Sequence, residues 1–490
     1  MAAASILPDS LLGLRIHFVG AKGTGVAALA EILSSLGARL SGSDVAEIFY
    51  TDEILNTLGV TMNVGFDAAN LPADAELVIH SAAYSRDSNP ELVTAAKRGL
   101  PILSYPEALG ALSRRSISAG ICGVHGKTTT TAFAGSLAKA LDLPATVLAG
   151  SAVASFGGRC TVIRGDRFFV AETCEYRRHF LNFMPVRIVL TSIESDHQDF
   201  YPTFDDIYRA FLDYLRLLPP AGELIYCADD AGAARAAAEI KAEKADLKLS
   251  PYGETAEGAY RLSNYRTGFG RATFSLAGFE RDFSLRVPGR HLALDATAAL
   301  VLALSILREE RGSDTVRPED LDAATAALAT FAGSKRRSEV LGEAGGVLFM
   351  DDYGHHPTAV RDTIRGIKEF WPERRLVVDF MSHTYSRTKA LFDEFASCLD
   401  DADAVVMHGI YASAREKPDP EVSGRGLYEE TRRRSKKGKS FFYYEDVLEG
   451  EAELASFLKP GDLFLTMGAG NNWKLGEALK ADLAARSGTK

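Results

Sequence analysis

The feature that most constrains this fold is a unit of buried strand, glycine-rich turn and helix, which occurs twice. Residues 14–19 are apolar enough for a buried strand, a turn follows at 20–25, and apolar residues then recur at helical spacing. The same succession runs from residues 116–122 through a turn at 123–127 into 128–141. Alternating strands and helices build parallel sheets covered on both faces, so the sequence predicts an α/β fold.

The length of the chain indicates more than one such sheet. At about 100–200 residues per domain, 490 residues suggest two to four domains. A third region repeats the alternation, with predicted strands at residues 347–350, 376–380, 404–408 and 462–466. We therefore expect three α/β domains, at residues 1–115, 116–332 and 333–490.

Composition excludes several classes of protein. With 46% hydrophobic and 24% charged residues the chain is typical of a folded protein, and its net charge of -10 argues against a nucleic-acid partner. Five scattered cysteines without a CxxC pair argue against a zinc ribbon or a disulfide framework. We see neither an apolar stretch of membrane-spanning length nor the basic start of a signal peptide, so we expect a cytoplasmic protein without a membrane partner.

The strongest local motif follows the predicted strand 116–122 and reads Gly123, Val124, His125, Gly126, Lys127, Thr128, Thr129. A phosphate-binding loop requires this position between a strand and a helix, because glycines let backbone N–H groups approach phosphate and the helix N-terminus favours anions. Lys127 would then reach the β- and γ-phosphates and Thr128 would ligate Mg²⁺. The alternative is an ordinary glycine turn, and Ile121 departs from the strict Walker pattern.

The first turn contains Gly20, Gly23 and Gly25, without the spacing of a dinucleotide fingerprint. Its position between a strand and a helix still suits a diphosphate. Asp44 ends the next predicted strand, where an acid that binds ribose is expected. A tight turn without a ligand is the alternative.

Acids and histidines follow two more predicted strands of the central region. Glu172 and Glu175 come after one strand, and Asp196 and His197 after another. Ligands of open parallel sheets lie beyond the carboxyl ends of the strands, and hard oxygen ligands suit Mg²⁺. Surface loops are the alternative reading of these residues.

A third constellation lies in the C-terminal region and comprises Arg336, Arg337, Asp351, Asp352, Tyr353, His355, His356, His383 and Arg387. Adjacent histidines do not share a face, so chelation of one metal by His355 and His356 is not expected. The four-residue spacing of His383 and Arg387 is compatible with one helical face. The alternatives are a cap or loop role for the two aspartates and a solvated salt bridge for Arg387.

These motifs, in this order, resemble those of the Mur ligases of peptidoglycan synthesis. The matching segments are GAKGTGVAALAEIL with SGSD, IHSAAYSRDSNPELVTAAKRGLPIL, GVHGKTTTT, VLTSIESDHQDFY, KRRSE, DDYGHHPTAV and HTYSRTKALFDEFA. They run from about residue 14 to about residue 395, and the branch they resemble most joins L-alanine to UDP-N-acetylmuramate. The resemblance implies a Rossmann-like UDP-binding domain, a central P-loop ATPase domain with a parallel sheet, and a C-terminal Rossmann-like domain.

The resemblance also implies roles for single residues. The UDP-sugar would be held by Gly20, Gly23, Gly25, Asp44 and Ser81. ATP would be bound by residues 123–129 and, at its ribose, by Asp351, with Mg²⁺ between Thr128, Glu172 and His197. Arg337 would reach the γ-phosphate. The amino-acid end would be shaped by Tyr353, His355, His383 and Arg387, with His355 a candidate for the general base.

The implied reaction is amide formation driven by ATP. A carboxylate is a poor acyl donor, and phosphorylation converts it into an acyl phosphate that the amine of L-alanine attacks. The expected partners are UDP-N-acetylmuramate and L-alanine, bound by a monomer or homodimer. The alternatives are a ligase that reloads a muropeptide onto the same UDP-sugar, a non-catalytic nucleotide-binding regulator and an NAD-dependent oxidoreductase.

The sequence departs from the family pattern at several positions. Leu292 and Asp295 stand where the family has asparagines, and Thr384 replaces an arginine. Amino-acid selectivity therefore stays open, as does any redox role of Cys122 and Cys174.

Overall fold

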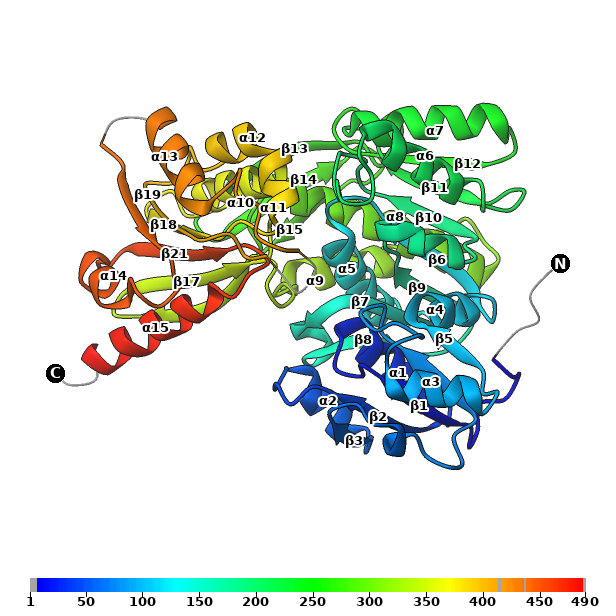
Figure 1. The fold of residues 1–490 in the computed structure, drawn as a ribbon. Coiled ribbons are helices and arrows are strands. Elements are labelled where there is room, and N and C mark those ends of the chain that lie inside the picture. The colour runs from blue at the N-terminus through cyan, green and yellow to red at the C-terminus, as the bar shows by residue number, and fades with distance from the viewer. Residues whose placement is uncertain (1–6, 413–415, 436–437, 488–490) are drawn as a thin grey trace. The chain divides into compact units, whose positions relative to one another are not determined.

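The structure is a computed structural model that describes residues 7–412, 416–435 and 438–487. The chain forms two compact units, each built from several chain segments (Figure 1). The first comprises Met1–Ile193, Tyr208–Arg261 and Asp295–Ala327. The second comprises Glu194–Ile207, Leu262–Leu294 and Leu328–Lys490. Each unit is described by itself.

The first unit begins with a five-stranded parallel sheet in the order β3-β2-β1-β4-β5. Its strands are β1 (Arg15–Val19), β2 (Arg39–Asp44), β3 (Thr61–Val64), β4 (Leu77–His80) and β5 (Ile102–Ser104). Its helices are α1 (Thr24–Ser35), α2 (Thr51–Thr57), η1 (Ala68–Asn70), α3 (Pro90–Lys97) and α4 (Tyr105–Ser113). The strand order reverses between β1 and β4, and ligands of open α/β sheets bind at such a point.

A second sheet of the first unit has seven strands in the order β12-β11-β10-β6-β9-β7-β8. They are β6 (Ile117–Cys122), β7 (Ala145–Val153), β8 (Arg159–Ile163), β9 (Phe168–Glu172), β10 (Arg187–Leu190), β11 (Glu223–Cys227) and β12 (Lys248–Tyr252). The associated helices are α5 (Lys127–Ala140), η2 (Ala154–Phe156), η3 (Tyr176–Asn182), α6 (Phe204–Leu215), α7 (Ala231–Glu243), α8 (Arg290–Arg311) and α9 (Pro318–Thr330). All pairs are parallel except β7 with β8, so the predicted parallel sheet carries an antiparallel edge.

Helix α8 corrects one expectation from the sequence. Among the described residues it is the one helix long and apolar enough to cross a membrane, and 83% of its most apolar window is buried within the protein. Such burial is typical of a core helix, which passes the same test of length and composition. Asp295 interrupts the apolar residues of this helix and Arg308 ends them, so the sequence contains no uninterrupted apolar run of that length.

The second unit contains a six-stranded sheet in the order β16-β17-β21-β18-β19-β20. Its strands are β16 (Glu339–Ala344), β17 (Val347–Asp352), β18 (Arg375–Phe380), β19 (Ala404–His408), β20 (Ser440–Tyr444) and β21 (Asp462–Met467). The helices are α10 (Pro357–Phe370), α11 (Tyr385–Ala390), α12 (Phe392–Ser397), α13 (Gly424–Arg434), α14 (Glu451–Phe457) and α15 (Trp473–Ser487). A separate antiparallel sheet is formed by β13 (Leu262–Gly268), β14 (Arg271–Leu276) and β15 (Asp282–Leu285).

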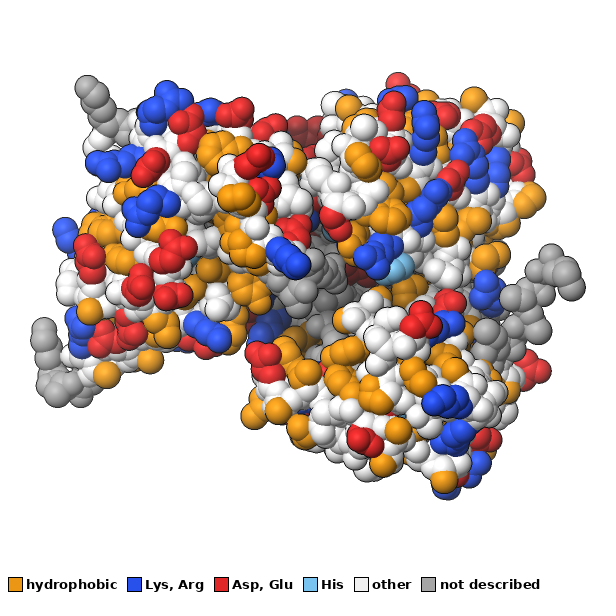
Figure 2. All heavy atoms as spheres, viewed as in Figure 1, with side chains coloured by type: hydrophobic (Ala, Val, Ile, Leu, Met, Phe, Trp, Pro, Cys, Tyr) orange, Lys and Arg blue, Asp and Glu red, His pale blue; other side chains and the backbone are white. Residues whose placement is uncertain are grey.

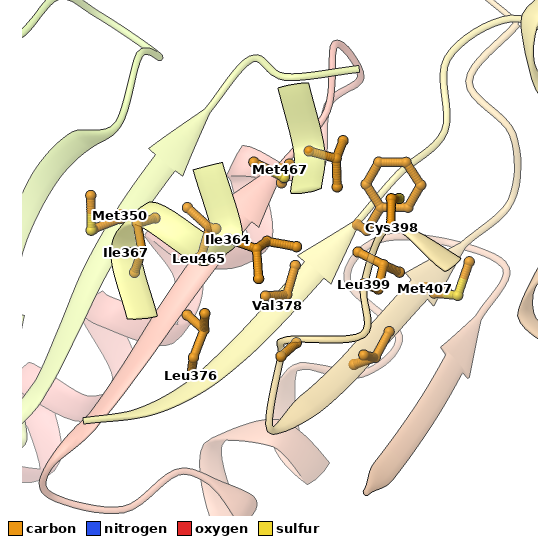
Figure 3. Close-up of a cluster of buried hydrophobic side chains, with 14 of the residues drawn as sticks. Met350, Ile364, Ile367, Leu376, Val378, Cys398, Leu399, Met407, Leu465 and Met467 are labelled. Carbon is orange, nitrogen blue, oxygen red and sulfur yellow. The ribbon is translucent and has the colours of Figure 1, made fainter. Parts of the chain in front are cut away.

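Apolar side chains cover both faces of the six-stranded sheet. Figure 3 shows one face, where labelled side chains of β17, β18, β19 and β21 pack with Ile364 and Ile367 of α10. On the other face Phe349, Val377 and Phe464 pack in a second buried cluster that also contains residues of α15. Consecutive strand residues therefore alternate between two cores, which is the pattern of a sheet buried on both sides.

The surface carries both signs of charge. On the face seen in Figure 2, Lys and Arg side chains are interspersed with Asp and Glu. Neither sign of charge is confined to one part of this face.

Candidate functional site

The loop after β6 has a conformation that requires glycine at two positions. Gly123 has φ +138° and Gly126 has φ +79°, both in the region that favours glycine. A Cβ atom at Gly123 would lie 2.0 Å from Thr191 Oγ1, and one at Gly126 would lie 2.4 Å from Asp295 Oδ1. Both glycines are therefore fixed by backbone conformation and by close packing. The second contact also places Asp295, one of the departures from the family pattern, against this loop.

The segment after β10 holds this loop in place. Val124 N–H donates to the carbonyl of Ser192 (3.1 Å), and His125 N–H donates to Ser192 Oγ (3.0 Å). Thr191 Oγ1 donates to the carbonyl of His125. Helix α5 then begins at Lys127, so its first N–H groups and its dipole favour an anion at the loop.

Lys127 lies folded over the loop. Its Nζ donates to the carbonyls of Gly123 and Val124 and lies 3.0 Å from Glu175 Oε2. Burial alone would lower the pKa of Lys127, but Glu175 and neighbouring groups raise it above its ordinary value. The loop thus carries a positive charge that a buried carboxylate neutralises in this state.

Two of the three predicted magnesium ligands meet beside Lys127. Thr128 Oγ1 donates to Glu172 Oε2 at 2.8 Å. Gly150 makes room for that carboxylate, because a Cβ there would lie 2.3 Å from Glu172 Oε2. A hydroxyl and a carboxylate at this separation are a donor set that fits a hard divalent cation. The third predicted ligand, His197, belongs to the second unit.

Two cavities of the first unit differ in their relation to these residues. A cavity of about 130 Å³ contains Glu172 and Cys174 in its lining, next to the aromatic side chains of Tyr105 and Phe180. A larger cavity of about 320 Å³ lies at the amino ends of β10, β11 and β12. In its lining Arg187 is ion-paired with Glu223, and Glu223 with Lys248. Of these two cavities, the smaller contains one predicted site residue, Glu172, in its lining, and residues 123–129 line neither.

The loop after β1 brings together the residues predicted for the UDP-sugar. Gly20 has φ +79°, and a Cβ there would lie 2.4 Å from the ring of Tyr84 and 2.9 Å from Ser81 Cβ. A Cβ at Gly25 would lie 2.7 Å from the ring of Tyr105, whereas Gly23 has no contact closer than 3.7 Å. Gly20 and Ser81 directly follow β1 and β4, where the strand order reverses.

Asp44 is hydrogen-bonded to the loop after β1. The side chain is 5% exposed, and its two oxygens accept N–H bonds from Lys22 (2.6 Å) and Val45 (2.8 Å). Tyr84 Oη donates to the same carboxylate at 3.4 Å. Asp44 therefore shapes the glycine loop, and a contact with ribose stays a prediction.

In the second unit the two aspartates at the end of β17 have different partners. Asp351 accepts bonds from Arg336 Nε and Thr466 Oγ1, both at 2.7 Å, and burial raises its pKa. Asp352 accepts bonds from the N–H groups of Ser338 (2.7 Å) and Gly354 (2.6 Å). Asp352 thus fixes the loop that contains Ser338 and the loop that contains Gly354. Asp351 is already bonded to Arg336, so a ribose hydroxyl would have to bind the same carboxylate as Arg336.

Arginines pack against Tyr353 in this region. The guanidinium carbons of Arg336 and Arg337 lie 5.1 and 5.2 Å from the centre of the Tyr353 ring. Arg336 and Ser338 have φ +58° and +46°, a conformation that non-glycine residues rarely adopt. Stored strain of this kind is common at functional sites. The reach of Arg337 to a γ-phosphate stays a prediction.

Four aromatic rings and one arginine gather in the loops that follow β17, β18 and β19. The His355 ring packs edge-on against Tyr353 (5.1 Å) and against His383 (5.7 Å), and the His383 ring stacks on Tyr411 (5.9 Å, 22°). Arg387 Nη1 lies 3.2 Å from His383 Nδ1. The structure thus brings together the four residues predicted for the amino-acid end.

A buried ion pair anchors this cluster. Arg387 donates to Asp196 Oδ1 through Nε (2.9 Å) and Nη2 (2.8 Å), and each residue is 5% exposed. Burial alone would raise the pKa of Asp196, but Arg387 and nearby histidines hold it far below its ordinary value. His197 has φ +56° and donates its backbone N–H to the same carboxylate (2.7 Å). Arg387 is therefore not a solvated salt bridge.

The two adjacent histidines have different hydrogen-bond partners. His355 Nδ1 lies 2.8 Å from the carbonyl of Tyr353, whereas His356 is the N-cap of α10 and accepts a bond from Thr358 N–H. Burial and the Arg387 guanidinium lower the pKa of His355 well below its ordinary value. A neutral imidazole that donates through Nδ1 keeps Nε2 as an acceptor.

Sequence reasoning did not assign three residues that the structure places in these sites: Glu175, Asp196 and Tyr411. Glu175 and Asp196 were visible as acids after strands, but their partners Lys127 and Arg387 lie 48 and 191 residues away in the chain. Tyr411 had no sequence signal of its own.

Comparisons with known proteins cover nearly the whole chain. Residues 15–116 match the model described as Mur ligase family, catalytic domain, residues 121–303 the Mur ligase middle domain, and residues 336–470 the Mur ligase glutamate ligase domain. The UDP-N-acetylmuramate--L-alanine ligase of Treponema pallidum (strain Nichols) is 53% identical over 473 residues, which is 96% of this chain and 97% of that protein. The enzyme of the same name from Borreliella burgdorferi is 38% identical over 95% of this chain and 98% of that protein.

Solved structures agree with these sequence matches. The UDP-N-acetylmuramate-alanine ligase of Thermotoga maritima has a TM-score of 0.75 and 25% identity, covering 97% of this chain and 100% of that one. A murein peptide ligase from Psychrobacter arcticus has a TM-score of 0.64 and 21% identity over 96% of this chain and 99% of that one, a likeness of fold.

Proposed function

The chain belongs to the Mur ligase family and is an ATP-dependent ligase of peptidoglycan precursor synthesis, and from this premise we propose how its residues divide the reaction. In the proposal the first unit phosphorylates the lactyl carboxylate of UDP-N-acetylmuramate. Residues of the second unit hold L-alanine for attack on the acyl phosphate. The supporting observation is the assembled set of Lys127, Thr128 and Glu172 at a glycine loop that opens a helix.

The first step brings two anions together. The carboxylate oxygen attacks the γ-phosphorus of ATP, ADP leaves, and the oxygen becomes the bridge of an acyl phosphate. Lys127 neutralises phosphate charge as it develops, and the first N–H groups of α5 hold the phosphates. Binding of nucleotide requires Lys127 to exchange Glu175 for phosphate oxygen.

A divalent cation fits the donor set of the first unit. Thr128 and Glu172 would hold Mg²⁺, and His197 stays the predicted third ligand. Bound there, Mg²⁺ would neutralise phosphate charge and orient the transferred group.

The second step forms the amide. The neutral amine of L-alanine attacks the carbonyl carbon, and the tetrahedral intermediate expels inorganic phosphate. His355 provides a neutral imidazole whose Nε2 is an acceptor, so it suits removal of a proton from the amine. Asp196 positions Arg387 near His383. There Arg387 offers positive charge for the carboxylate of L-alanine.

Further assignments belong to the same proposal. Arg337 contacts the γ-phosphate, Asp351 the ribose, and Gly20, Asp44 and Ser81 the UDP-sugar. We place the enzyme in the cytoplasm, where its nucleotide substrates are made, as a monomer or homodimer. Membership of the family argues against the dinucleotide oxidoreductase alternative.

The experiment is an assay of phosphate release with single omissions. Release should require ATP, UDP-N-acetylmuramate and L-alanine together, and the product should contain one alanine by mass spectrometry. A tripeptide offered in place of L-alanine should not support turnover. Turnover with the tripeptide and none with L-alanine would favour the muropeptide ligase, and nucleotide binding without any amide product would favour the regulator.

A further inference from the structure

A buried polar cluster beneath the amino-acid end has no role in the mechanism above. It consists of Asp379 near the end of β18, His408 at the end of β19 and Asn472 after β21. Their exposed fractions are 0%, 1% and 0%. Ionisable groups are almost never fully buried without compensating partners, so their presence in the interior needs an explanation.

The three side chains are bonded to one another. His408 Nε2 lies 2.5 Å from Asp379 Oδ1, and Asn472 Nδ2 donates to Asp379 Oδ2 at 3.0 Å. Asn472 Nδ2 also contacts the carbonyls of Asp379 and Met467, both at 3.1 Å. Burial alone would lower the pKa of His408, but Asp379 raises it above its ordinary value, which favours an ion pair. One carboxylate therefore joins three separate elements.

These same elements carry the site. His383 follows Asp379 by four residues, and Tyr411 follows His408 by three. The loops are paired, because Thr384 N–H donates to the carbonyl of Tyr411 (2.9 Å) and Tyr411 N–H to that of Ser382 (2.9 Å). The His383–Tyr411 stack therefore depends on how the ends of β18 and β19 are placed.

The third element supports the same stack from the loop after β21. Met381 N–H donates to the carbonyl of Met467 (3.0 Å), and Figure 3 shows Met467 and Met407 in the adjoining core. A Cβ at Gly468 would lie 2.3 Å from the carbonyl oxygen of Met381. A Cβ at Gly470 would lie 3.2 Å from Tyr411 Cβ, so the loop after β21 packs closely against Tyr411. Asn472 fixes the far end of that loop.

Backbone strain shows that the segment needs such support. Thr384, between His383 and α11, has φ +67° although it carries a side chain. Residues in sparsely populated conformations persist only where the surroundings over-determine them. Thr384 is held by its backbone bond to Tyr411, which lies three residues after His408 of the cluster.

We propose that Asp379, His408 and Asn472 are positioning residues that hold His383, Tyr411 and Arg387 in the geometry that binds the amino acid. The inference rests on the proposed function, because it takes that end of the site to bind L-alanine. None of the three touches substrate. Their loss would therefore raise the KM for L-alanine while binding of ATP and UDP-sugar is retained.

The test compares Asp379→Asn with Asn472→Asp. Asp379→Asn removes the carboxylate that His408 and Asn472 contact, and Asn472→Asp places a second carboxylate beside Asp379 and two backbone carbonyls. We expect each variant to raise the KM for L-alanine at least about tenfold, with the KM values for ATP and UDP-N-acetylmuramate within about twofold.

Three further variants guard against simple loss of folding. His408→Gln keeps a donor near Nε2, so it should affect the KM for L-alanine less than His408→Leu. His17→Gln is the matched control, since His17 forms a fully buried pair with Glu91 (3.0 Å) in the first unit. It should lower the melting temperature without changing the KM for L-alanine.

The outcomes separate the two proposals. Lower melting temperatures with an unchanged KM for L-alanine, equal changes in all three KM values, or equal effects of His408→Gln and His408→Leu would overturn the positioning role. Failure of the unmodified enzyme to use L-alanine would instead refute the proposed substrate.

Discussion

The two glycine loops of the first unit have the same local architecture and different side-chain chemistry. Each follows a buried parallel strand and opens a helix, and each contains one lysine. At the second loop Lys127 is the first residue of α5 and lies beside Thr128, Glu172 and Glu175. At the first loop Lys22 precedes the helix, and its Nζ is bonded to the carbonyls of Val45 (3.0 Å) and Glu47 (2.8 Å).

The comparison shows which part of the motif carries the chemistry. A strand, a glycine turn and a helix N-terminus are sufficient to bind an anion. Phosphoryl transfer also needs a cation aimed at the phosphate and a ligand set for a metal. Only the second loop has both among the described residues, so we expect binding at the first and reaction at the second.

The largest effect should come from Lys127→Ala. Loss of the charge at the γ-phosphate should lower kcat/KM by about 10³-fold, because the stabilisation acts where charge develops. Steady-state phosphate release measures this. Lys139→Ala, at the other end of α5 and exposed, is the matched control. Equal turnover in Lys127→Ala and the parent would remove the second loop from the reaction.

A smaller effect should follow from Glu172→Gln. Removal of the carboxylate bonded to Thr128 should weaken activation by Mg²⁺ at least about tenfold. A titration of phosphate release against Mg²⁺ gives the activation constant, with the exposed Glu243→Gln as control. Binding of UDP-N-acetylmuramate without Mg²⁺ should not change, and a parallel loss there would show that the two loops are not independent.

At the first loop, Gly20→Ala should affect binding only. The substitution meets the ring of Tyr84 at 2.4 Å and forces alanine to φ +79°. The KM for UDP-N-acetylmuramate should rise about tenfold, while the KM for ATP stays within about twofold. Gly59→Ala separates the effect of backbone strain from that of the steric clash. Gly59 also has positive φ, but nothing lies within 4 Å of its Cβ position. An equal rise for ATP would contradict the assignment of the loops.

Lys22→Met should give the smallest effect. Lys22 holds the segment after β2, so its loss should raise the KM for UDP-N-acetylmuramate only about two- to fivefold and leave kcat unchanged. Kinetics with UDP-N-acetylmuramate as the varied substrate distinguish this result from that of Lys127. A fall in kcat comparable to that of Lys127→Ala would show that both lysines act in catalysis.

Much of the fold follows from local patterns in the sequence. Buried parallel strands read as apolar runs, and the glycine turns mark where α1 and α5 begin. The antiparallel pairing of β7 with β8 and the sheet β13-β14-β15 were not predicted. Strands β14 and β15 alternate between buried and less buried residues over short segments, whereas β7 is buried over most of its length. The choice of strand partner depends on packing elsewhere in the fold.

The candidate site also contains parts that the sequence predicts and parts that it does not. The loop residues 123–129 were found because their geometry is local to one strand, one turn and one helix. The Arg387–Asp196 pair joins residues 191 positions apart, and the Asp379–His408 pair joins residues 29 apart. Such contacts are set by tertiary packing, so a single sequence shows the residues without their partners.

The most direct test of the account follows an oxygen atom. UDP-N-acetylmuramate labelled with ¹⁸O in its lactyl carboxylate is turned over with ATP and L-alanine, and the phosphate is examined by mass spectrometry. An acyl-phosphate route transfers one carboxylate oxygen to each phosphate released and leaves ADP unlabelled. Unlabelled phosphate, or label in AMP, would contradict phosphorylation of the carboxylate at the Lys127 loop.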